Sequence, residues 1–225
     1  MGLRIAIADC GMGNLFSVAQ ALRAVGCAAE VTQDPLVVRS ADGVVLPGVG
    51  AFGDAMEALT RLGLDQAILE SASLGRPIFG VCLGMQLLLT ESEEFGLHHG
   101  LGLIRGRVRR LENPRWGDRL LKVPHVGWNE IVPAKGDGRE WGDPLLEGVA
   151  HSEYMYFVHS YHAQPEDSSS VTAVTHYGGL RVCASLRRSN VFGCQFHPER
   201  SGRAGLRIYQ NFANLVEREA RNRVS

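Results

Sequence analysis

The sequence predicts an α/β protein with an open, mostly parallel central sheet, flanked by helices and extended by antiparallel strands in its second half. Two observations lead to this prediction. Strand and helix signals alternate through the first half of the chain, which is the pattern of a parallel sheet covered on both faces. In the second half, strand-like runs follow one another with few helices between them, as in antiparallel additions to such a sheet.

The first half opens with a short apolar strand at 3–8, after which Asn14 can cap a helix. Apolar residues recur in this helix at helical spacing as far as Val25, and Gly26 ends it. Further strands are predicted near 28–31, 44–46 and 78–81, and helices at about 54–74 and 85–89.

The second half is predicted to be mainly strands, followed by a closing amphipathic helix with Leu206, Tyr209, Phe212 and Val216 on one face. The predicted strands are 103–111, 128–131, 154–158, 171–176, 181–186 and 191–195. A loop is predicted at 135–142, between the second and the third of these strands. Without internal repeats, the 225 residues are expected to form a single domain, 1–225.

Composition excludes several classes of function. The 23 basic and 24 acidic residues give a net charge of -1, which favours neither nucleic acid nor an anionic membrane as partner. The longest apolar stretch, 77–89, is interrupted by Gln86 and is too short to span a bilayer. Five cysteines, an odd number without regular spacing, are typical of a reducing compartment. We therefore expect a soluble, cytoplasmic protein.

The segment Gly80-Val81-Cys82-Leu83-Gly84 follows a buried strand and precedes a helix-like run. A strand, a glycine-flanked nucleophile and a helix in that order predict a nucleophile elbow, the sharp turn that lifts a side chain above a sheet. The start of the following helix offers backbone N–H groups and a positive dipole end, which stabilise a thiolate and an oxyanion. Cys82 is therefore the predicted nucleophile.

A cysteine nucleophile needs a base that is itself oriented by a further group. The apolar run 191–196 ends in His197-Pro198-Glu199. Side chains two apart on an extended segment face the same way, so His197 and Glu199 are expected to lie side by side at the end of this strand. Cys82, His197 and Glu199 then form a nucleophile, base and orienter set.

With these two motifs the chain resembles the class I (triad) glutamine amidotransferases, whose elbow reads G-x-C-x-G and whose base and orienter read H-P-E. Further segments make it similar to one family of that class, the glutaminase subunits of imidazole glycerol phosphate synthases. These segments are 9–15, 46–56, 124–129, 158–161 and 195–202, so the resemblance runs from about residue 5 to 212.

The resemblance implies roles for further residues. Pro47-Gly48-Val49-Gly50 would be the oxyanion strand, with Val49 or Gly50 and the N–H of Leu83 stabilising the tetrahedral intermediate. Glutamine would be bound by four residues: Gly50, Gln86, Ser160 and Tyr161. Without the resemblance, the glycines would only permit a tight turn, and Gln86 would be an ordinary solvated helix residue.

The same resemblance implies the reaction and its partner, with no cofactor and no metal. Cys82 would attack the carboxamide of L-glutamine, His197 would protonate departing ammonia, and water would release glutamate from the thioester. Ammonia would reach a cyclase subunit with the fold of a (β/α)8 barrel, which converts the nucleotide PRFAR to imidazole glycerol phosphate and AICAR in L-histidine biosynthesis. The partner's ligand would activate glutamine hydrolysis by reorienting the Val49 peptide. The docking face is expected to include Met12, Asn14, Trp128 and Asn129.

Other readings of these motifs remain open. The glutaminase subunit of another class I amidotransferase, such as that of pyridoxal phosphate synthesis, shares both motifs but not segments 47–56 and 124–129. A γ-glutamyl hydrolase would use the same nucleophile on larger substrates. A catalytically silent scaffold subunit would be expected to have lost one of the three catalytic residues.

Histidines outside the triad are predicted to be structural or surface residues, and cysteines outside it to be inert. The four histidines that invite a metal interpretation lack paired ligand spacing, namely His98, His99, His159 and His162. Four cysteines are expected to be inert, namely Cys10, Cys27, Cys183 and Cys194. Cys10 replaces a tyrosine that is common in the resembled family, close to the expected docking face.

Overall fold

The computed structural model describes residues 3–134 and 141–223, so most of the predicted loop 135–142 lies outside the described residues. The helices are α1 (Leu15–Ala24), α2 (Pro35–Ser40), α3 (Phe52–Leu62), α4 (Leu64–Ser73), α5 (Leu83–Leu87) and α6 (Gly202–Asn222). Short 3-10 turns cover Pro144–Leu146, Ser168–Ser170 and Pro198–Arg200. Among the described residues, no helix is long and apolar enough to cross a membrane.

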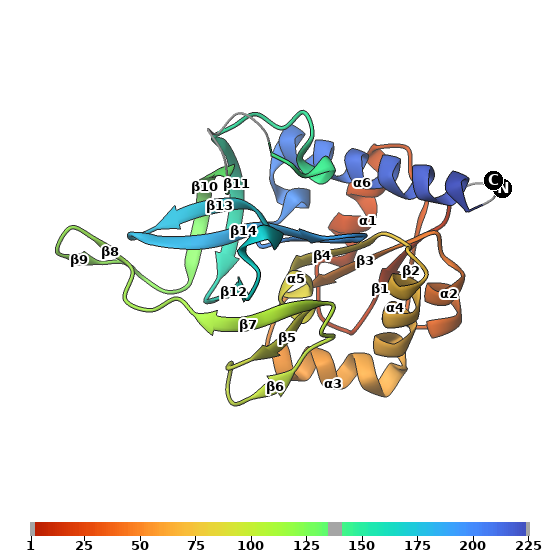
Figure 1. Ribbon diagram of the computed structural model, residues 1–225, viewed down its shortest axis with the longest axis horizontal. Helices are drawn as coiled ribbons and strands as arrows, with labels where there is room; N and C mark the ends of the chain where they lie inside the picture. Colours follow the sequence, from red (N-terminus) through yellow and green to blue (C-terminus); the bar gives the residue numbers. More distant parts are fainter. Residues whose placement is uncertain (1–2, 135–140, 224–225) are drawn as a thin grey trace.

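The largest sheet has nine strands in the order β11-β10-β13-β14-β15-β4-β3-β1-β2 (Figure 1). Its strands are β1 (Ile5–Ala8), β2 (Ala29–Thr32), β3 (Gly43–Gly48), β4 (Ile78–Cys82), β10 (His125–Pro133), β11 (Glu153–His159), β13 (Val171–Tyr177), β14 (Leu180–Arg188) and β15 (Val191–Cys194). The five strands from β15 to β2 are parallel, and the other four are antiparallel additions. The predicted fold class is confirmed.

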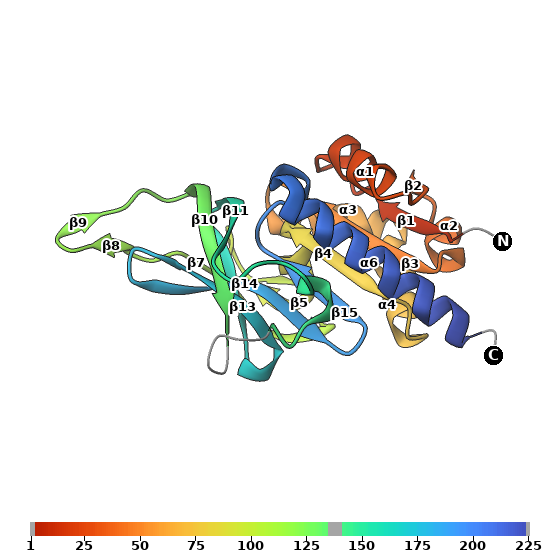
Figure 2. The ribbon, with the colours of Figure 1, turned by 90° about the horizontal axis from the view of Figure 1, so that it is seen from above.

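Two smaller sheets were not predicted from the sequence. One has the order β12-β7-β5-β6 and is built from β5 (Leu89–Ser92), β6 (His98–His99), β7 (Ile104–Arg110) and β12 (Tyr161–Pro165). The predicted strand 103–111 therefore belongs to this sheet and not to the central one. The other is the hairpin of β8 (Arg115–Trp116) and β9 (Arg119–Leu120), which extends away from the body of the molecule in Figures 1 and 2.

Helices cover both faces of the parallel half of the sheet (Figure 2). On one face, α1 and α6 pack against β1, β3 and β4 through a cluster that includes Leu22, Phe79 and Phe212. On the other face, α2 to α5 pack through a second cluster that includes Leu46 and Leu59. Because strands buried on both faces are apolar throughout, β1, β3 and β4 read as continuous hydrophobic runs.

Several helices differ from their predicted extent. The predicted helix 54–74 is divided into α3 and α4 by Gly63, whose φ of 69° interrupts the helical backbone. Asn14 precedes α1 but makes no side-chain capping hydrogen bond, so the predicted cap interaction is absent. The helix after the elbow ends at Leu87, because Leu89 already belongs to β5.

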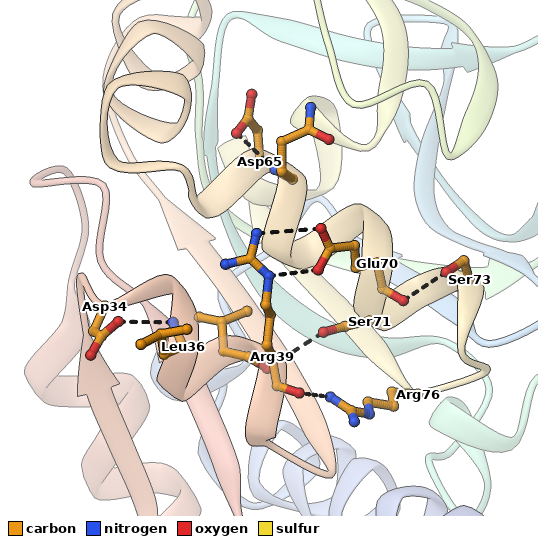
Figure 3. A network of polar contacts seen from close by, with 10 residues as sticks. Asp34, Leu36, Arg39, Asp65, Glu70, Ser71, Ser73 and Arg76 are labelled. Carbon is orange, nitrogen blue, oxygen red and sulfur yellow. Dashed lines mark hydrogen bonds and ion pairs between the residues drawn. The ribbon is translucent and has the colours of Figure 1, made fainter.

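Helix α2 was missed because it has only six residues and starts with a proline. Asp34 accepts a hydrogen bond from the Leu36 N–H, and Pro35 occupies the first turn, where its missing N–H costs nothing. Tertiary contacts then fix α2 on α4. The Arg39 side chain pairs with Glu70 at 2.5 Å, and Ser71 donates to the Val38 carbonyl (Figure 3).

Candidate active site

Cys82 is the last residue of β4, at the centre of the sheet, between β3 and β15. Gly48 at the end of β3 lies in register with Cys82, and Cys194 at the end of β15 lies in register with Val81. The segments that follow β3 and β15 are the expected oxyanion strand and the H-P-E motif. Parallel pairing therefore brings three distant parts of the chain to one edge of the sheet, where α/β proteins place their sites.

The elbow is strained at its nucleophile. Cys82 has φ 55° and ψ −111°, a backbone conformation that residues other than glycine rarely adopt, and the residue is 6% exposed. Gly84 lies so close to β3 that a Cβ there would overlap the carbonyl oxygen of Leu46. Because α5 has only five residues, it adds little dipole, and the first backbone N–H groups of the helix, beginning with Leu83, are the donors that the turn can offer.

His197 and Glu199 are hydrogen-bonded to each other. The distance between His197 Nδ1 and Glu199 Oε1 is 2.8 Å, and their side chains are 5% and 1% exposed. The predicted reason for this pairing is wrong, because the strand ends at Cys194 and Pro198 begins a 3-10 turn. The turn is fixed by the His197 N–H, which donates to Tyr156 O, and by the Ser201 hydroxyl, which donates to His197 O.

The environment of His197 favours its charged form. Burial lowers the pKa of the imidazole, but hydrogen bonding and the charges of Cys82 and Glu199 outweigh it and raise the pKa to about 10. The other ring nitrogen, Nε2, is buried and has no hydrogen-bond partner of standard geometry among the described residues. A ring oriented at Nδ1 with a free Nε2 beside a thiol is the arrangement that proton transfer requires.

Glu199 is also held by Tyr209, a residue that the sequence predicted only as part of the hydrophobic face of the closing helix, α6. The hydroxyl of Tyr209 donates to Glu199 Oε2 at 3.3 Å. Burial raises the pKa of this phenol well above its ordinary value, so it remains a donor. No motif signalled this role, because Tyr209 also has the spacing of an ordinary core residue.

A cavity of ≈290 Å³ opens beside Cys82. Ligand pockets run from about 300 to 1,000 Å³, so this one suits a small molecule such as a free amino acid. Its lining includes every residue that the sequence assigned to oxyanion stabilisation and glutamine binding, namely Val49, Gly50, Leu83, Gln86, Ser160 and Tyr161. It also includes residues not assigned to the site, namely Glu94, Pro124, Val158 and His159.

The side chain of Gln86 is buried, so it is not a solvated helix residue. Its Nε2 donates to Tyr161 O and to Gln195 Oε1, both at 2.9 Å. The amide of Gln195 continues toward the nucleophile, with its Nε2 3.7 Å from Cys82 Sγ. Sequence reasoning placed Gln195 in a motif but gave it no role, since only the pairing of β15 with β4 brings it to the sulfur.

Two buried histidines extend this network. His159 Nδ1 bonds to Tyr161 O at 2.9 Å, so it carries the proton, and His159 Nε2 accepts from His125 Nδ1 at 3.1 Å. Burial lowers the pKa of His125 to about 4 and that of His159 to about 3, so both are neutral at pH 7. His125 is stacked between Phe157 and Tyr177.

The residues expected at a docking face do not all share one surface. Trp128 is 55% exposed on β10, whereas its neighbour Asn129 faces the opposite side and donates to His176 O. Met12 is partly buried against the oxyanion strand, where a Cβ at Gly50 would lie 3.2 Å from its sulfur. Asn14 is half-buried at the start of α1.

Comparisons with known proteins show the family to which the chain belongs. The family model "Glutamine amidotransferase class-I" matches residues 6–215. The chain is 49% identical to imidazole glycerol phosphate synthase subunit HisH of Syntrophotalea carbinolica, over 94% of this chain and 100% of that protein. It is also 49% identical to the HisH subunit of Symbiobacterium thermophilum, over 95% of this chain and 94% of that protein.

Solved structures share the fold at low sequence identity. A putative GMP synthase subunit from Thermoplasma acidophilum has a TM-score of 0.73 and 16% identity, covering 100% of this chain and 99% of that one. PurLQS from Thermotoga maritima has a TM-score of 0.71 and 20% identity, covering 96% and 99%. By family model and by full-length relatives, the chain belongs to the class I glutamine amidotransferases and, within them, to the HisH subunits of imidazole glycerol phosphate synthase.

Proposed function

We propose that this protein is the glutaminase subunit of imidazole glycerol phosphate synthase, hydrolysing L-glutamine to glutamate and ammonia for a cyclase subunit. The observation that carries the proposal is the strained Cys82 beside both a small cavity and the His197–Glu199 pair. The HisH relatives support the choice of this synthase over other amidotransferases. They also argue against a γ-glutamyl hydrolase.

In the proposed reaction, Cys82 and His197 work as a thiolate and an imidazolium. Because the pKa of His197 is raised to about 10, the ring is protonated at neutral pH and balances the thiolate. The thiolate adds to the carboxamide carbon, and the backbone N–H groups of Leu83 and of Val49 or Gly50 bind the oxyanion. His197 then gives its proton to departing ammonia and afterwards takes one from the water that cleaves the thioester.

Recognition of glutamine would use the polar lining of the cavity. Both N–H groups of Gln86 are engaged, so its Oε1 is left as an acceptor for the α-ammonium group. Glu94 places a carboxylate in the same lining, which suits that positive charge. Ser160, Tyr161 and Gly50 remain for the α-carboxylate. This division matches the charges of a free amino acid and disfavours a glutamine residue inside an ordinary peptide, whose α-amino and α-carboxyl groups are blocked.

The partner is proposed to be the cyclase (β/α)8 barrel, docked near Met12, Asn14 and Trp128. Met12 touches the oxyanion strand at Gly50, so contact with a partner there can reach the Val49 peptide. Asn129 would act from behind this surface through its hydrogen bonds, since its side chain faces inward. We expect the partner's nucleotide to accelerate glutamine hydrolysis through this contact.

The decisive experiment combines the protein with PRFAR and a cyclase subunit, then measures glutamate release and imidazole glycerol phosphate. Cys82→Ala should abolish the glutamine-dependent reaction and leave the ammonia-dependent one intact. Equal glutamine-dependent synthesis by the wild type and by Cys82→Ala would establish a silent scaffold instead. Equal glutamine turnover with and without the cyclase and nucleotide would contradict the proposed activation.

A further inference from the structure

Gln195 is fully buried beside the nucleophile, and the mechanism proposed above gives it no part. It directly follows β15, which pairs in parallel with β4 so that Cys194 opposes Val81. The next residues on the two strands are Gln195 and Cys82. The Gln195 backbone N–H donates to Ala184 O of β14 at 2.9 Å, so the main chain of Gln195 is also held by the strand on the side away from β4.

The orientation of the Gln195 amide follows from one backbone carbonyl. Tyr161 O can only accept, so the Gln86 atom 2.9 Å from it is the nitrogen Nε2. That nitrogen also donates to Gln195, whose contacting atom must then be the oxygen Oε1. The remaining end of the Gln195 side chain, 3.7 Å from Cys82 Sγ, is therefore its NH₂ group.

An N–H group that donates to the sulfur stabilises the thiolate more than the thiol. Hydrogen bonds to a charged acceptor are stronger than those to a neutral one, and stronger still where water is excluded. A further polar neighbour of the sulfur, Val158 O at 3.8 Å, can accept from a thiol but repels a thiolate. Gln195 is thus positioned to offset the carbonyl and to favour the ionised nucleophile.

We propose that Gln195 is a further catalytic residue of this site, whose Nε2–H donates to the Cys82 sulfur and stabilises the thiolate, while its Oε1 orients Gln86 toward the substrate. This inference rests on the proposed glutaminase function, because it assigns a role in the same reaction. It also predicts that the two ends of one side chain affect different kinetic parameters. The N–H end acts on kcat, and the Oε1 end acts on KM through Gln86.

Two substitutions separate the two ends. Gln195→Leu removes both, so the rate of Cys82 alkylation by iodoacetamide at neutral pH should fall roughly tenfold, and the midpoint of its pH dependence should rise by about one unit. Gln195→Glu keeps an acceptor for Gln86 but places a carboxylate beside the sulfur. It should slow alkylation and kcat more than Gln195→Leu does, with KM for glutamine within about twofold of wild type.

The measurement follows the Cys82 peptide by mass spectrometry in the full-length chain, with Gln164→Leu as control because Gln164 is exposed on β12. Thermal unfolding of each variant shows whether it is folded. A folded Gln195→Leu variant with the wild-type alkylation profile would overturn the proposal. If neither variant folds, the test is the side-chain amide signal of Gln195 in wild-type protein, observed by ¹⁵N NMR. This signal should shift as Cys82 ionises and stay constant in Cys82→Ala; a constant signal in both proteins overturns the proposal.

Alkylation requires neither glutamine nor a cyclase partner, so this result is independent of the glutaminase assay. A shifted alkylation profile together with no glutamate release by the wild-type complex would contradict the proposed function while leaving the Gln195–sulfur contact intact. Normal glutamate release together with an unshifted profile would remove Gln195 from the mechanism and leave the proposed function standing.

Discussion

At the scale of single residues, His197 is kept protonated against the effect of burial by hydrogen bonds with Cys82 and Glu199, by the charge of Cys82 and by the charge of Glu199. Glu199→Gln preserves the shape of the side chain but removes this charge. We expect kcat for glutamine hydrolysis to fall roughly 10² to 10⁴-fold, the usual contribution of general acid–base catalysis. An NMR titration should show the pKa of His197 falling from about 10. An unchanged titration would mean that Cys82 alone accounts for the raised pKa.

Tyr209 allows a milder test of the same carboxylate. Tyr209→Phe removes the hydroxyl that donates to Glu199 Oε2 at 3.3 Å but keeps the ring that packs edge-on against Phe79. Because this hydrogen bond is long and the carboxylate retains its bond to His197, we expect kcat to fall by less than about tenfold. Steady-state kinetics measures this effect, and a loss as large as that of Glu199→Gln would contradict it.

At the scale of elements, helix α6 fixes the catalytic turn by close approach. A Cβ at Gly205 would overlap the carbonyl oxygen of Pro198, inside the His197–Glu199 segment. Gly205→Ala should therefore displace the turn, lower kcat at least tenfold and cost about 1–3 kcal/mol of unfolding free energy, as overpacking usually does. Kinetics and urea unfolding measure the two effects.

Gly117→Ala is the matched control for Gly205→Ala, because a Cβ at Gly117 meets no atom and only its positive φ of 57° opposes the change. It should cost about 1 kcal/mol of unfolding free energy and leave kcat unaltered. If Gly205→Ala behaved like this control, the close packing of α6 on the turn would have no catalytic consequence.

The elements that the sequence predicted best are those whose pattern is local. Buried parallel strands such as β1 and β4 appear as apolar runs, and the glycine-flanked cysteine between strand and helix marks the elbow. Non-local features were missed. The separate sheet of β5, β6, β7 and β12 depends on pairings between distant segments, and α2 is too short to show a helical period.

The residues of the site were likewise predicted where the signal is local and missed where it depends on distant pairings. Cys82, His197 and Glu199 belong to motifs and could be named from the sequence. Gln195 and Glu94 reach the cavity or the sulfur only through pairing and packing. The pairing of His197 with Glu199 was expected for the wrong reason, because a 3-10 turn and not strand alternation brings them together.

At the scale of the whole molecule, buried histidines have opposite effects on how the stability of the fold depends on pH. The pKa of His159, lowered by burial from 6.5 to about 3, means that the unfolded chain binds its proton more readily, so stability is lost as pH falls below 6.5. His125 and His162, both lowered to about 4, act in the same direction. His197, raised to about 10, stabilises the fold below 6.5 and loses this effect as pH rises toward 10.

Urea unfolding at a series of pH values tests these signs. His159→Gln should reduce the loss of unfolding free energy between pH 6.5 and about 3, since it removes the histidine whose pKa is lowered furthest. His176→Gln, at an exposed position, is the control and should retain the wild-type slope. Parallel curves for wild type and His159→Gln would refute a neutral, buried His159.

The docking proposal concerns the surface around Trp128, whose ring meets Tyr156 edge-on, while Arg200 lies 4.6 Å from the Tyr156 ring centroid. Trp128→Ser should weaken binding of the cyclase by about 2 kcal/mol or more, as loss of an aromatic anchor does. Alkylation of Cys82 in the isolated chain should not change. Leu74→Ser, exposed at the opposite end of the strands, is the control for titration calorimetry. Equal affinities for both variants would place the interface elsewhere.

The position of β15 between β4 and β14 has a consequence for synthesis on the ribosome. The nucleophile emerges early, but its base follows β15, the last strand of the described residues, and that strand also joins the two halves of the sheet. A nascent chain that stops before β15 therefore carries a thiol without the imidazole needed to ionise it. Such truncated chains cannot release ammonia from glutamine, so the protein becomes catalytically competent only when β15 joins the two halves of the sheet.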